Sequence, residues 1–168
     1  MATVAVDAPP QQLTQDAKIR KIREKCRGSL FWTAWYLCGF TKMSIVLHYA
    51  LVLWFEKGLA DGNRWFLCII PRGHFKTSLL NIAYIVHTLI NDPNKRILMV
   101  MHNLSEATRK GRKLRSILTS RAMRIYFPLV IPPAEAQRRV WTSTEFSVNR
   151  SIESAEASVT LAGVASGL

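Results

Sequence analysis

The stretch that decides the fold reads Trp65-Phe66-Leu67-Cys68-Ile69-Ile70-Pro71-Arg72-Gly73-His74-Phe75-Lys76-Thr77-Ser78-Leu79-Leu80. An apolar run of strand length meets a short turn and then the first turns of an apolar-faced helix. This order suits a phosphate-binding loop, because the backbone N–H groups of the turn and the helix N-terminus both favour an anion. Lys76 adds a mobile positive charge, and Thr77 offers a hydroxyl to Mg²⁺. The stretch therefore predicts nucleotide binding; the alternative is an ordinary strand-turn-helix with a surface lysine.

The loop departs from the G-x-x-x-x-G-K-[ST] pattern at both glycines. Ile70 and Phe75 occupy the glycine positions, and only Gly73 supplies glycine freedom inside the turn. The residues predicted to bind the nucleotide are Pro71, Arg72, Gly73, His74, Phe75, Lys76, Thr77 and Ser78.

Composition and charge bound the protein class. The chain has 168 residues, enough for about one domain, and its 49% apolar content is typical of a globular protein. Lys and Arg number 23 against 11 Asp and Glu, a net charge of +12, which indicates a polyanionic partner: nucleic acid, nucleotide or an anionic membrane surface. The three cysteines lack C-x-x-C spacing, which argues against a disulfide framework or a zinc site.

The N-terminal third predicts helices. Residues 1–15 are polar, lack a signal-peptide core, and are expected to form a disordered leader. Residues 18–27 predict a basic amphipathic helix, either a solvated face or a nucleic-acid contact. Residues 29–55 are the most apolar part, but Lys42 divides them into pieces shorter than the roughly 18 residues of a membrane span. We therefore expect two buried or partner-facing helices there, the second ending with Gly58 as its C′ residue.

The middle of the chain predicts a βαβ unit. Residues 65–70 form a continuous apolar run, typical of a strand buried on both faces. A helix with its apolar face between positions 79 and 90 follows, and residues 96–101 read as a second buried strand. Together these elements predict a parallel sheet with a right-handed crossover.

Further elements follow this unit. Residues 106–118 predict a helix capped by Asn103 or Ser105. Five of the seven consecutive residues at positions 109–115 are basic, which predicts contact with DNA or phosphate. They are Arg109, Lys110, Arg112, Lys113 and Arg115. Short strands are expected within residues 141–148 and 158–162.

With these pieces in order, the sequence resembles the N-terminal part of a phage terminase large subunit, the ATPase that packages DNA into capsids. The motif Pro-Arg-Gly-His-x-Lys-Thr at positions 71–77 is fairly specific to this family. Phe75 departs from the glycine that most members carry. The other matching stretches are residues 29–39, 47–56, 92–101, 141–150 and 159–167.

The resemblance implies a fold class: α/β, a partial P-loop NTPase of the additional-strand class, with a parallel sheet preceded by two apolar helices. Residues 1–27 would be a leader and basic helix, and residues 28–168 the N-terminal part of the ATPase domain. In relatives the next strand ends in two acids, and a nuclease domain follows. The chain is therefore expected to be a fragment with little ATPase activity alone, and with an open apolar sheet edge that aggregates or recruits a partner.

The resemblance also implies roles and partners. Lys76 would contact the β- and γ-phosphates of ATP, and Thr77 would ligate Mg²⁺. Arg72 is the candidate catalytic residue, as a charge stabiliser of the transition state; the alternative is a surface-exposed structural arginine. Residues 48–56 match the region that holds adenine, although a satisfied buried histidine is expected at His48. Implied partners are double-stranded DNA, a portal protein and a small terminase subunit, with a homo-oligomeric ring for the full-length protein and the host cytoplasm as its location.

Two other classes of function stay open. One is a non-enzymatic basic DNA-binding or assembly protein with a degenerate nucleotide site. The other is a small membrane-associated protein built on residues 29–55.

Overall fold

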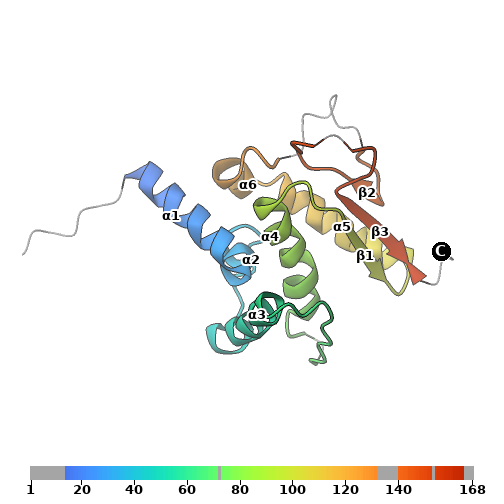
Figure 1. Cartoon of the computed structure of the whole chain (residues 1–168), viewed down its shortest axis with the longest axis horizontal. Coiled ribbons are helices and arrows are strands. Elements are labelled where there is room, and N and C mark those ends of the chain that lie inside the picture. The colour runs from blue at the N-terminus through green and yellow to red at the C-terminus, as the bar shows by residue number, and fades with distance from the viewer. Residues whose placement is uncertain (1–13, 72, 132–139, 153, 165–168) are drawn as a thin grey trace, which may run out of the picture.

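The computed structural model describes residues 14–71, 73–131, 140–152 and 154–164 of a mixed α/β protein. Figure 1 shows the first helix at one end of the molecule and the sheet at the other. The elements are α1 (Gln15–Gly28), α2 (Leu30–Tyr36), α3 (Ile45–Ala60), the π-helix η1 (Ser78–Ala83), α4 (Tyr84–Asn91), β1 (Ile97–Met101), α5 (Leu104–Leu118), α6 (Arg121–Tyr126), β2 (Glu145–Phe146) and β3 (Val159–Gly163). The expected leader falls almost wholly outside the described residues.

The three N-terminal helices begin at hydroxyl caps. The side chains of Thr14, Ser29 and Ser44 accept hydrogen bonds from the first turns of α1, α2 and α3, which satisfies N–H groups that have no partner within the helix. Between α2 and α3 the chain turns at Gly39, whose φ is 69°. The predicted basic helix and the predicted pair of apolar helices are thus confirmed. Among the described residues, no helix has both the length and the apolar character needed to cross a membrane.

The prediction that Gly58 ends its helix is wrong. Gly58 lies inside α3, which continues to Ala60. It is buried under the Phe66 ring, where a Cβ atom would come within 2.5 Å of the ring carbon Cε1. The glycine therefore lets the segment after α3 pack closely against the helix.

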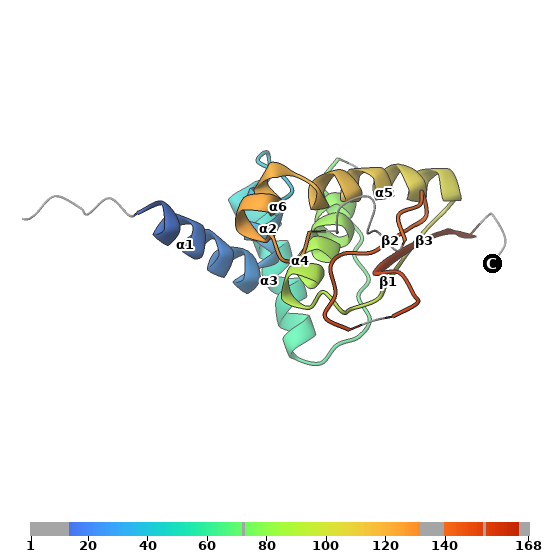
Figure 2. The same cartoon turned by 90° about the horizontal axis from the view of Figure 1, so that it is seen from above.

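The sheet has three strands in the order β1-β3-β2. β1 and β3 are parallel, with Ile97 opposite Val159, and β2 is antiparallel to β3, so the sheet is mixed rather than fully parallel as expected. Helix α5 lies along one face of the sheet (Figure 2) and packs closely against β3 at Gly111. A parallel pair with a helical crossover is thus present, but it joins β1 to β3.

The predicted buried strand at residues 65–70 is wrong, and so is the βαβ unit built on it. The segment belongs to no sheet, and Trp65, Leu67 and Ile69 are respectively 93%, 80% and 84% exposed. An extended segment needs a neighbouring strand for its backbone hydrogen bonds, and none of the described strands pairs with this one. β1 likewise pairs on one edge only, and Leu98 and Val100 on it are exposed.

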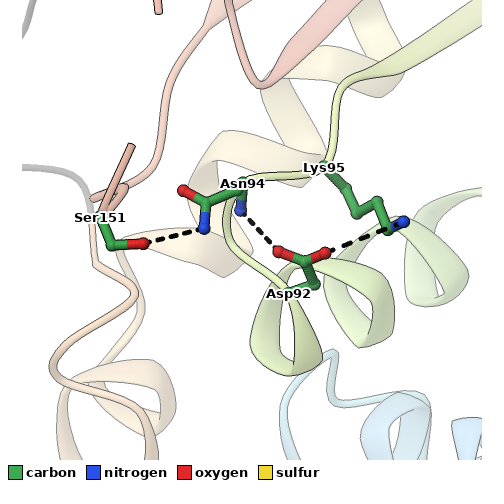
Figure 3. A network of polar contacts seen from close by, with 4 residues as sticks. All are labelled: Asp92, Asn94, Lys95 and Ser151. Atoms are coloured by element: carbon green, nitrogen blue, oxygen red, sulfur yellow. Dashed lines mark hydrogen bonds and ion pairs between the residues drawn. The ribbon is translucent and has the colours of Figure 1, made fainter. Parts of the chain in front are cut away.

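A polar network fixes the turn between α4 and β1 (Figure 3). The backbone N–H of Asn94 donates to Asp92 (3.0 Å), and the Asn94 amide donates to the Ser151 hydroxyl (2.8 Å) and accepts from the N–H of Ile152 (3.1 Å). Lys95 lies 3.8 Å from the Asp92 carboxylate. The turn after α4 is thereby held to the segment that leads into β3, which aligns the two parallel strands.

The remaining predicted strands are present in shorter or shifted form. Within residues 141–148, only Glu145–Phe146 joins the sheet, and Trp141 pairs back on Phe146 as an isolated bridge. The predicted strand at residues 158–162 corresponds to β3, one residue later. Asn103 caps α5 as predicted by accepting from the N–H of Glu106 at 2.8 Å.

Candidate phosphate-binding site

The loop leads into a continuous helical stretch at residues 76–91. Lys76 and Thr77 lie in its first turn, π-helical residues Ser78–Ala83 follow, and α4 completes it. Leu79 and Ile82 are buried, so the apolar face predicted from the sequence anchors the helix in the core. The helix therefore presents Lys76 and Thr77 to the loop from a fixed base.

The Lys76 ammonium closes the loop on itself. It donates a hydrogen bond to the carbonyl oxygen of Ile70, across a distance of 3.0 Å. This carbonyl belongs to one of the two positions at which the sequence departs from the phosphate-loop pattern. The side chain is only partly exposed, and its charge lies inside the turn.

Two loop residues adopt left-handed backbone conformations. Gly73 has a φ of 86°, and Phe75 has a φ of 53°, the one positive value for a non-glycine among the described residues. For an L-residue this conformation costs about 1 kcal/mol or more, which explains why a glycine suits the position of Phe75. The Phe75 ring offsets that cost by packing against Phe40 and His48, with centroids 6.2 and 5.4 Å away.

A hollow of about 630 Å³ lies over the loop. Two side chains of α5, Glu106 and Lys110, also line it. Arg72, the predicted catalytic residue, lies outside the described residues. The loop residues that line the hollow are Pro71, Gly73, His74, Phe75, Lys76, Thr77 and Ser78. The structure therefore brings the other seven predicted residues together.

Glu106 and Lys110 were not predicted as site residues. The sequence did contain a signal for them, because loops and helices that follow the carboxyl ends of parallel strands gather at one edge of a sheet. α5 begins directly after β1, and the cluster of basic residues on α5 predicted phosphate or DNA contact without selecting one residue.

Of the two charged side chains that α5 contributes to the hollow, Glu106 has an ion-pair partner and Lys110 has none among the described residues. Glu106 lies 3.8 Å from the guanidinium of Arg109 on the outer side of the helix. Within the described part of the chain, the Lys110 ammonium and the Thr77 hydroxyl have no hydrogen-bond or ion-pair partner. A partly buried ammonium without a carboxylate favours an anion nearby.

Lys76 and Thr77 also line a smaller hollow of about 310 Å³. Phe55 comes from the segment expected to hold adenine, and with Phe66 it provides aromatic surface. The remaining lining residues are Cys68, Leu80 and Asn81.

His48 is buried but only half satisfied. Its Nδ1 accepts a hydrogen bond from the Ser44 N–H at 2.8 Å, whereas Nε2 has no partner among the described residues. The imidazole faces the Phe75 ring edge-on. The expectation of a satisfied buried histidine is therefore correct for burial and incomplete for hydrogen bonding.

The site fits phosphate better than it fits a protein-held metal. The described residues contain no group of three or more His, Cys, Asp or Glu side chains placed to hold an ion. Thr77 offers one hydroxyl, and Mg²⁺ takes its other ligands from phosphates and water in many nucleotide sites.

The basic residues outside the hollow serve different purposes. Arg23 of α1 donates to the carbonyl oxygens of Tyr126 and Ile125 at the end of α6, at 2.5 and 3.3 Å, and so joins the two helices. Arg115 of α5 donates to the carbonyl oxygen of Thr142. Besides Arg23, the exposed basic side chains of the two helices are Lys18, Arg20, Lys21, Arg27, Arg109, Arg112 and Lys113.

Comparison of the chain with protein families, curated proteins and solved structures finds no match in any of the three. The function is therefore argued from the geometry of the site and from the sequence motif.

Proposed function

We propose that this chain is the ATP-binding part of a viral DNA-packaging motor, a terminase large subunit that couples ATP hydrolysis to translocation of double-stranded DNA into a procapsid. The observation that carries the proposal is the meeting of Lys76, Thr77 and the turn at Gly73 around one hollow at the start of a helix. A P-loop NTPase fold of the additional-strand class is part of the same proposal.

The chemistry of the site favours a nucleoside triphosphate. The Lys76 ammonium can move from the Ile70 carbonyl to a phosphate oxygen, because both are hydrogen-bond acceptors and the phosphate carries charge. Backbone N–H groups of the loop and the helix start add donors for phosphate oxygens. The Thr77 hydroxyl would ligate Mg²⁺, which neutralises phosphate charge during phosphoryl transfer.

The hollow beside Phe55 and Phe66 supports a place for the base. Aromatic side chains stack on nucleobases, and this hollow adjoins Lys76 and Thr77. A nucleotide would then lie with its phosphates over the loop and its base near α3. This orientation agrees with the region that the resemblance assigns to adenine.

The chain should bind ATP without turning it over efficiently. Hydrolysis requires a residue that positions water and an acid that helps to hold the metal. Glu106 is the one acid among the described residues lining the hollow, and it is directed to Arg109. Turnover at the rate of a complete packaging ATPase would contradict this expectation.

The proposal is tested by calorimetric titration of ATP and Mg²⁺ into the wild-type chain and Lys76→Ala. We expect the substitution to abolish measurable binding. Lys42→Ala removes an exposed lysine between α2 and α3 and should leave the affinity unchanged. Unchanged affinity in Lys76→Ala would remove the phosphate-loop assignment.

The second candidate is a basic DNA-binding or assembly protein. The exposed lysines and arginines of α1 and α5 favour it, because such side chains neutralise phosphates and release counterions. Salt-sensitive DNA binding that ignores both ATP and Lys76→Ala would support this candidate over the motor.

A further inference from the structure

We infer that Lys110 of α5 is a second cation of the phosphate site, lining the same hollow as Lys76 and contacting the same polyphosphate chain. The inference deepens the proposed function and rests on it for the identity of the ligand. Lys110 itself lies on α5, outside the sequence motif at positions 71–77.

The position of Lys110 favours a role at the phosphate site. Lys110 and Lys76 line the same hollow of about 630 Å³ from two elements separated by β1 in the sequence. A triphosphate carries several negative charges spread along its length, so one lysine at the loop leaves part of the chain without a cation. A second lysine in the hollow supplies that charge.

No carboxylate of the described residues competes with an anion for Lys110. Lys110 is only partly exposed, and within the described residues no carboxylate pairs with its ammonium. Glu106 lies one helical turn before it, at the i, i+4 spacing that often forms an ion pair, yet Glu106 lies near Arg109 instead. The Lys110 charge is thus left to face the hollow.

Close contacts fix the position of α5, and with it that of Lys110, against the sheet. The neighbouring Gly111 lies against Leu161 of β3, and a Cβ atom there would come within 2.1 Å of the Leu161 Cδ1. At the C-terminal end of β3, a Cβ atom on Gly163 would come within 2.2 Å of the backbone nitrogen of Leu104, at the start of α5. These two contacts set the distance between α5 and the sheet, and so the reach of Lys110 into the hollow.

The test uses inorganic tripolyphosphate and ATP as probes, titrated calorimetrically into the full chain. Lys110→Gln should weaken tripolyphosphate binding about tenfold, the loss of one charge-assisted contact, and should reduce its salt dependence. Lys113→Gln removes an exposed charge from the same helix and should change affinity less than about twofold. Lys110→Arg, which keeps the charge, should retain most of the affinity.

A variant that strengthens binding separates this contact from a folding defect. Glu106→Gln removes the negative charge from the hollow and should tighten tripolyphosphate binding, which a misfolded chain would not do. Thermal melts of every variant provide the folding control.

The outcomes separate the two proposals. If Lys76→Ala abolishes binding while Lys110→Gln leaves it intact, the inference is overturned and the proposed function stands. If Lys110→Gln weakens binding while Lys76→Ala does not, the anion site on α5 stands and the phosphate-loop assignment falls. A wild-type chain that binds neither probe overturns both.

Discussion

The ring of Phe75 meets the imidazole of His48 edge-on, with the ring centroids 5.4 Å apart. This contact joins the loop before the π-helix to α3 and holds a phenylalanine in a left-handed backbone conformation. A residue that departs from the expected glycine is therefore accommodated by packing rather than by backbone freedom. The contact makes the loop part of the helical core.

The two effects at Phe75 can be separated by a matched pair of variants. Phe75→Ala and Phe75→Gly both lose the ring and its contacts, but only glycine relieves the positive φ. We expect both variants to be less stable than the wild type, and the glycine variant to be more stable than the alanine variant by about 1 kcal/mol. Urea unfolding measures the difference; equal stabilities would show that the φ of Phe75 stores no strain.

The cysteines should differ sharply in reactivity. Burial raises the pKa of Cys26 and of Cys38 to about 12, so both thiols stay protonated at neutral pH. Cys68 is less buried and lines the smaller hollow beside Lys76. A thiol reagent should label Cys68 first in the native chain, and ATP should slow that labelling. Labelling unaffected by saturating ATP would remove the smaller hollow from the nucleotide site.

Stability should fall in mild acid because of His87. Its Nδ1 lies 3.0 Å from the Cys26 carbonyl oxygen, and burial lowers the pKa of the imidazole, an effect that this hydrogen bond partly opposes. The unfolded chain therefore takes up the proton first, near pH 6.5, and stability is lost as the pH falls from there through the folded pKa.

The measurement is the urea midpoint at pH 7.5 and pH 5 for the wild type and His87→Gln. The wild type should lose more stability between the two pH values than the variant. His102→Gln, which removes an exposed histidine, should behave like the wild type. An identical loss in His87→Gln would assign the acid sensitivity elsewhere.

The exposed apolar segment should drive association. Trp65, Leu67 and Ile69 present alternate side chains to solvent, as do Leu98 and Val100 of the singly paired β1. Surfaces of this kind tend to aggregate or bind a partner. The double variant Leu67→Thr/Ile69→Thr should shift sedimentation towards monomer, whereas Leu129→Thr, another exposed leucine, should not. A monodisperse wild-type monomer would contradict this prediction.

Local signals in the sequence predicted the helices well. Asn103 caps α5 as predicted, because capping depends on only a few neighbouring residues. The caps Thr14, Ser29 and Ser44 were not predicted, although they belong to the residue types that favour this position. The gathering of loop residues around Lys76 was also predictable, since it follows from a turn and a helix start that are adjacent in the chain.

Non-local pairing could not be predicted in the same way. An apolar run such as residues 65–70 has the composition of a buried strand, but a strand forms only where another offers hydrogen bonds. Gly58 illustrates a similar limit, because a glycine required by the Phe66 ring cannot be told from a glycine that ends a helix. The placement of Lys110 depends on how closely α5 approaches β3, which is a property of the packed sheet.

The π-helical turns at Ser78–Ala83 have a geometric consequence for the loop. A π segment holds one residue more than the α-helical turns it replaces, and its wider turns take up that residue. Lys76 and Thr77 therefore keep the orientation relative to α4 that an α-helix without the extra residue would give them. Deleting one residue from the segment should convert it to α-helix and leave Lys76 and Thr77 at the hollow.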